Sequence, residues 1–162
     1  MAVAISGAAA KAATGQRMEM LIDGSWVASA SGDWIGVESP GNRRVFASVP
    51  RGDAADVDRA VKAASAAFSR WSKVAPRERG RILQRIADAV EGRVEELAKI
   101  IAEETGNAIR TQARPEAKNS ADIMRYFGGL ASELKGETIP LGEQVLSYTR
   151  REPIGVVGAI IP

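Results

Sequence analysis

An unbroken apolar run covers residues 154–161, with the sequence IGVVGAII. A half-exposed strand alternates apolar and polar residues, so this run predicts a strand covered on both faces, as in a parallel sheet with helices on each side. Residues 145–149 also have strand character, and residues 150–153 connect the two runs. A covered strand needs neighbouring strands, so the pattern predicts the beginning of a larger sheet.

Short strand-like runs dominate the part of the chain before residue 51. There are four of them, at residues 20–22, 25–27, 34–38 and 44–49. Asp23-Gly24, which separates the first two, is a dipeptide preferred in tight primed turns and predicts a β-hairpin. Turn-forming residues at 39–42 separate the last two. Together the runs predict a small β-meander.

Four segments then show apolar residues at helical spacing, at residues 53–71, 76–92, 94–106 and 115–134. Asp53 can cap the first helix, Asp56 adds negative charge to its first turn, and Gly106 suits the end of the third. The predicted buried faces carry Val57, Ala60, Val61, Ala64, Phe68 and Trp71 in the first helix; Ile82, Leu83, Ile86, Ala87 and Val90 in the second; Val94, Leu97, Ala98 and Ile101 in the third; and Ala117, Ala121, Met124, Phe127, Leu130 and Leu134 in the fourth. The fold class expected from these elements is α/β.

Composition narrows the possible chemistry. The sequence contains no cysteine and no histidine, which excludes disulfides, thiol nucleophiles, Cys/His zinc sites and imidazole general bases within these 162 residues. A net charge of +2 is weak support for a nucleic-acid partner, and no apolar stretch approaches the roughly 20 residues that span a bilayer. We therefore expect neither nucleic acid nor membrane as a partner.

Three further patterns allow a functional and a structural interpretation. Arg77, Arg81 and Arg85 lie four apart, which suits a phosphate-binding ridge or a solvated helix face partly paired with Glu78 and Asp88. Glu103 and Glu104 could act in acid–base chemistry or hold a cation, although adjacent helical residues point about 100° apart and would not converge on one substrate. The residues at the carboxyl end of the last strand could contact a cofactor or pack in the core; they are Ile160, Ile161 and Pro162.

Five segments in this order resemble the amino-terminal portion of the NAD(P)-dependent aldehyde dehydrogenase superfamily. They are MLIDGSWV at 20–27, residues 39–71, residues 76–109, MRYFGGLASELKGETIP at 124–140 and YTRREPIGVVGAIIP at 148–162. The resemblance covers nearly everything from residue 19 onward. Asn107 and Ala108 depart from the lysine and proline common in the family, which leaves the subfamily undefined.

The resemblance implies a parent enzyme that oxidises an aldehyde to an acid with NAD or NADP through a cysteine thiohemiacetal. The nucleophilic cysteine, the general-base glutamate and the oxyanion-stabilising asparagine of the family are absent from this sequence, so it offers no catalytic residue. Ile160, Ile161 and Pro162 match the segment that lines the adenosine side of the cofactor site. Val37, Glu38 and Glu104 match positions where some members bind Na⁺ or K⁺, largely through backbone carbonyls.

The same resemblance divides the chain into four parts. They are a flexible arm at 1–18, the amino-terminal part of the cofactor domain at 19–143, one arm of an oligomerisation ribbon at 144–153, and the first strand of an incomplete Rossmann-like parallel sheet at 154–162. A targeting segment is the alternative for the arm, although its charges follow the apolar part.

We expect a cytoplasmic homodimer or homotetramer. The rival functions are a stand-alone, non-catalytic helical interaction module and a basic nucleic-acid binder.

Overall fold

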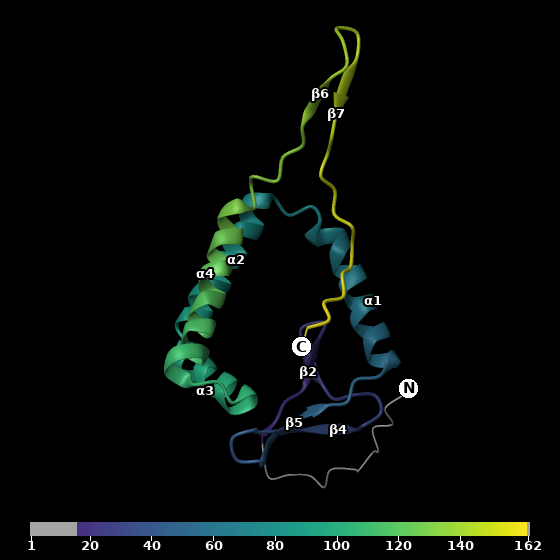
Figure 1. Cartoon of the computed structure of the whole chain (residues 1–162). Helices are drawn as coiled ribbons and strands as arrows, with labels where there is room; N and C mark the ends of the chain where they lie inside the picture. Colours follow the sequence, from purple (N-terminus) through teal and green to yellow (C-terminus); the bar gives the residue numbers. More distant parts are fainter. Residues whose placement is uncertain (1–15, 162) are drawn as a thin grey trace, which may run out of the picture. The chain divides into compact units, whose positions relative to one another are not determined.

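The structure, a computed structural model, describes residues 16–161 (Figure 1). The chain divides into two compact units, which we describe separately. The first contains the residues up to 64 together with residues 103–106, and the second contains residues 65–102 together with the chain from 107 onward.

The first unit contains five short strands. They are β1 (Gln16–Arg17), β2 (Met20–Ile22), β3 (Ser25–Val27), β4 (Trp34–Glu38) and β5 (Val45–Pro50). The order β1-β5-β4 forms one sheet, in which β1 is parallel to β5 and β4 is antiparallel to it. The hairpin β2-β3 forms a separate sheet, so the prediction of one continuous β-meander is wrong. Residues 16 and 17, which the sequence assigned to the arm, pair with β5, and residues 1–15 of that arm lie outside the described residues.

The turn of the β2-β3 hairpin confirms the prediction made from its dipeptide. Asp23 has φ 52° and Gly24 has φ 74°, and positive values at both central residues define a type I′ turn. The twist of this turn matches the twist of the two strands, which explains why so short a hairpin is well formed.

Three helices follow the predicted boundaries closely, whereas the fourth ends at Leu130, four residues before its predicted end at Leu134. The four helices are α1 (Ala54–Trp71), α2 (Pro76–Glu91), α3 (Val94–Thr105) and α4 (Arg114–Leu130), and a π-helical turn η1 (Ile109–Ala113) precedes α4. The sequence did not predict η1. Pro115 has no N–H to donate to the carbonyl of Thr111, and the preceding amides instead bond five residues back, as Ala113 N to Ala108 O at 3.2 Å.

In the second unit α2 and α4 lie side by side and approach each other closely (Figure 1). Two glycines meet at the crossing, because a Cβ at Gly80 would meet the Gly128 carbonyl oxygen, and a Cβ at Gly128 would lie 3.0 Å from the Gly80 carbonyl oxygen. Every buried hydrophobic residue in the described part of the chain is an alanine, and no large side chain there is fully buried. The helix pair is therefore joined by close backbone approach through small residues.

The predicted buried faces are only partly covered. Ala87, Ala98, Ala117 and Ala121 are buried as expected. In contrast, Val57 is 62%, Phe127 57% and Leu134 73% exposed, so the prediction that these large side chains are buried is wrong for the described residues. Helical periodicity marks a face suited to burial, but burial requires a second layer, which residues 16–161 do not supply at these positions.

A two-stranded ribbon and an extended segment complete the second unit. The strands β6 (Thr138–Pro140) and β7 (Leu146–Tyr148) pair antiparallel, with Ile139 opposite Ser147. The sequence predicted β7 one residue longer at each end and missed β6. Residues 149–161 have no regular secondary structure, so the strand predicted at 154–161 is not formed. A strand is defined by its hydrogen-bonded neighbours, and residues 154–161 have none within the described chain, whereas Thr149 N still donates to Glu137 O at 2.8 Å.

Candidate functional site

The most highly connected polar group in the first unit is the carboxylate of Asp56, in the first turn of α1. The side chain is 2% exposed. Its Oδ2 accepts hydrogen bonds from Ser29 Oγ at 2.5 Å and Asp53 N at 3.1 Å, and its Oδ1 accepts from Ala30 N at 3.0 Å and Arg59 Nη2 at 2.6 Å. Each oxygen thus accepts two hydrogen bonds, which uses the full acceptor capacity of a carboxylate.

The local sequence explains how Asp56 reaches this position. Asp53 caps α1 by accepting from Ala55 N at 2.8 Å and Asp56 N at 3.0 Å, as predicted. The cap turns Asp56 back toward the loop between β3 and β4, where Ser29 and Ala30 meet it. Asp56 therefore ties the β-strands of the first unit to the start of α1.

The surroundings of Asp56 stabilise its ionised form. The hydrogen bond from the Ser29 hydroxyl is the largest cause that lowers its pKa, and bonds from the amides of Ala30 and Asp53 and from Arg59 lower it further, while burial acts in the opposite direction. A fully ionised and fully bonded carboxylate has no free lone pair with which to accept a proton. The arrangement thus suits structural anchoring and does not suit acid–base chemistry.

We expect the first unit to lose stability in acid because of Asp56. A carboxylate whose pKa is lowered on folding stabilises the fold above its unfolded pKa of about 3.9, and this contribution disappears as the pH falls through the lower folded pKa. Tryptophan fluorescence, which reports on Trp26 and Trp34 in this unit, should therefore show an acid transition that begins near pH 4. An Asp56→Asn variant should lack the corresponding part of the transition. An unchanged acid profile in that variant would contradict the assignment.

The residues matched to a cation site all fall in the first unit. Val37 and Glu38 end β4, where the pairing with β5 shifts register, and Glu104 is exposed in the last turn of α3. A Cβ on Gly106 would lie 3.0 Å from Pro40 Cγ, so the end of α3 lies near the turn after β4. Backbone carbonyls and carboxylates are oxygen donors of the kind that hard cations prefer, so the residues fit such an ion in donor type.

Carboxylates contribute little to this position. Glu38 forms an ion pair with Arg43, with 2.9 Å between Oε1 and Nε. Residues 16–161 contain no group of three or more His, Cys, Asp or Glu side chains that could hold a metal ion. The Na⁺ or K⁺ site at Val37, Glu38 and Glu104 stays a prediction that would depend on backbone oxygens.

The residues matched to the cofactor site lie in the extended segment. Ile160 is fully exposed and Ile161 is 81% exposed, whereas Pro162 lies outside the described residues. Both described side chains stand in solvent, so their role in cofactor binding also stays a prediction.

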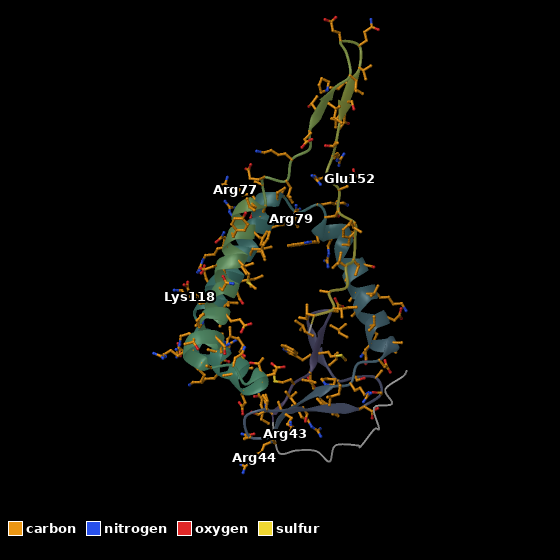
Figure 2. All side chains as sticks on the ribbon, viewed as in Figure 1. Arg43, Arg44, Arg77, Arg79, Lys118 and Glu152 are labelled. Atoms are coloured by element: carbon orange, nitrogen blue, oxygen red, sulfur yellow. The ribbon has the colours of Figure 1, made fainter. Side chains whose placement is uncertain are left out.

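The arginine row on α2 is solvated. Arg77, Arg81 and Arg85 are all exposed, and Figure 2 shows Arg77 extending from the start of α2. Arg81 pairs with Glu78, as expected for a solvated face. Asp88, the other predicted partner, instead accepts from Arg125 Nη2 on α4 at 2.9 Å. This pairing links α2 to α4 across the helix crossing.

None of the helices in the described part of the chain is long and apolar enough to cross a membrane.

The sequence did not identify Ser29, Asp56 and Arg59 as a cluster, because their bonds join residues up to 27 apart in the chain. The only local signal was a second aspartate three residues after the helix cap, which the sequence attributed to the helix dipole.

Comparison with known proteins finds aldehyde dehydrogenases. The profile of the aldehyde dehydrogenase family matches residues 26–162. An aldehyde dehydrogenase from Aspergillus niger is 40% identical over 148 residues, which cover 91% of this chain and 30% of the relative. The chain spans less than a third of the length of that relative.

Solved structures give the same result. The NAD-dependent aldehyde dehydrogenase from Sinorhizobium meliloti has 39% identity and a TM-score of 0.74, covering 79% of this chain and 26% of the solved chain. The NAD⁺ complex of an aldehyde dehydrogenase from Bacillus cereus has 30% identity and a TM-score of 0.82, covering 86% and 29%. The helices and small sheets of this chain therefore match between a quarter and a third of each of these two solved chains.

Proposed function

Because the chain belongs to the aldehyde dehydrogenase family, we propose that it forms the amino-terminal part of an enzyme that oxidises an aldehyde to a carboxylic acid with NAD or NADP. The observation that carries this proposal is the match itself. The family profile matches residues 26–162, and the separate alignment with the relative from Aspergillus niger covers only 30% of that relative. The rest of the parent enzyme would supply the remaining domains.

The exposure of large apolar side chains in the described chain supports the same proposal. Its buried hydrophobic residues are all alanines, and large apolar side chains such as Ile154 at 95% and Val157 at 74% stand exposed. Burying a side chain of this size stabilises a fold by about 1.5–3 kcal/mol. We therefore interpret residues 154–161 as the first strand of a Rossmann-like parallel sheet whose neighbours belong to the parent.

In the parent enzyme this chain would contribute residues that bind the cofactor and a ribbon that joins subunits. Residues 160–162 would line the adenosine side of the cofactor, which accepts a hydride when bound. The ribbon β6-β7 would join subunits into a homodimer or homotetramer, since Leu141 and Leu146 are exposed on it at 62% and 79%. We propose a cytoplasmic location for the parent.

We expect the 162-residue chain by itself to have no dehydrogenase activity. Attack on the aldehyde requires a thiolate, and the sequence contains no cysteine. The purified chain should give no increase in reduced nicotinamide absorbance with either cofactor and an aldehyde. Measurable reduction above a no-enzyme control would contradict this expectation.

Reading the gene beyond codon 162 tests the proposed function directly. We expect it to encode a polypeptide about three times as long, with a cysteine that becomes essential for activity, since well-placed nucleophiles cannot be removed without losing most of the rate. The full-length product should reduce NAD or NADP with an aldehyde, and its Cys→Ala variant should not. An inactive full-length product would overturn the proposed function.

A further inference from the structure

The apolar surface of α2 extends well beyond the side that packs on α4. One side packs on α4 and includes Gly80 and Ala87, and Ala87 is 0% exposed. Ala89 lies about 200° further around the helix, at 100° per residue, and it is exposed. Ile82, Ile86 and Val90 lie between these two positions, so the apolar stripe covers about half of the helix circumference, which is wider than one neighbouring helix covers.

The second side of α2 forms a groove with the start of α3. The groove has a volume of about 350 Å³ and is lined mainly by aliphatic side chains. They are Ile82, Ile86, Ala89, Val90 and Leu97. All of these residues belong to the second unit, and Ile86 at the centre is 42% exposed.

Two arginines complete the lining of the groove, Arg85 and Arg93. Arg93 is paired with Glu96, at 3.1 Å between Nε and Oε2. Arg85 forms no hydrogen bond or ion pair with another described residue. An aliphatic surface beside an unpaired guanidinium fits an apolar ridge that carries a carboxylate at its edge.

We propose that this groove receives an aliphatic ridge with an acidic flank from the part of the parent polypeptide that follows residue 162, which makes α2 the middle layer of three. The inference rests on the proposed function, since the relatives are more than three times as long as the portion matched here. The groove is separate from residues 160–162 and from the ribbon β6-β7, to which the proposed function assigns cofactor binding and assembly.

A cysteine placed in the groove tests this layer. The sequence has no cysteine, so Ala89→Cys introduces a single thiol in the 162-residue chain, and trypsin releases it in the peptide 86–93. Arg77→Cys on the exposed side of α2 is the matched control (Figure 2). We expect maleimide to label the thiol at position 89 at least about tenfold more slowly in the full-length protein than in the 162-residue chain, because thiolate access limits the reaction. Labelling at position 77 should be equal in both.

Equal labelling of position 89 in both proteins would overturn the inference. Protection that disappears on dilution of the full-length protein would also overturn it, because the occupant would then be a second copy. Should Ala89→Cys fail to fold, hydroxyl-radical oxidation of Ile82 and Ile86 in the unmodified proteins gives the same comparison. If position 89 is protected in a full-length protein that has no dehydrogenase activity, the covering of the groove is supported and only the proposed function is overturned.

Discussion

Replacing Asp56 by asparagine is expected to separate the β-strands of the first unit from the start of α1. Asparagine has one acceptor oxygen, so its amide nitrogen must face two of the four donors that Asp56 satisfies. A buried donor left without an acceptor destabilises a fold strongly, and here a partly buried guanidinium also loses its counter-charge. We expect the melting temperature of this unit to fall by on the order of 10 °C.

Hydrogen exchange gives the local measurement. The amides of Ala30 and Asp53 donate to Asp56, so they should exchange much faster in Asp56→Asn than in the unmodified chain. Asp58→Asn is the matched control on the same helix. Asp58 is 59% exposed and, among residues 16–161, its side chain pairs only with Lys62, and exposed ion pairs contribute little. Equal exchange in the two variants would mean that Asp56 is not the anchor.

Replacing Gly80 by alanine is expected to push α2 and α4 apart. Alanine in a helix interior is favoured over glycine by about 1 kcal/mol, so intrinsic propensity alone would predict stabilisation. The added Cβ, however, would meet the carbonyl oxygen of Gly128 well inside van der Waals contact and would lie 3.2 Å from the Cβ of Ala131. A backbone oxygen in a helix cannot turn aside. Overpacking of this kind costs about 1–3 kcal/mol, and the net change should be destabilising.

The chain offers a control on the facing helix. Gly129 lies in α4, next to the contact residue Gly128, and a Cβ there would meet nothing within 4 Å. Gly129→Ala should therefore stabilise the pair by about 0.4–1 kcal/mol. Thermal denaturation followed by circular dichroism at the helix band distinguishes the two signs. Stabilisation by Gly80→Ala would show that the two helices are not in close contact in solution.

The sequence by itself determined the local elements of this protein. The Asp53 cap, the Asp23-Gly24 turn and the glycine after α3 act on neighbouring residues only, so their geometry could be predicted without knowing the rest of the fold. The order of the segments also pointed to the family, which the later comparisons confirmed.

Only the tertiary structure decided which of these elements meet. Periodicity identified apolar faces but could not show that alanine and glycine would join α2 to α4 while larger side chains stay exposed, because burial depends on the neighbouring layer. The same holds for Asp56, whose partners Ser29 and Ala30 come from a distant loop. Contacts between distant residues depend on the path of the whole chain, and no local pattern encodes that path.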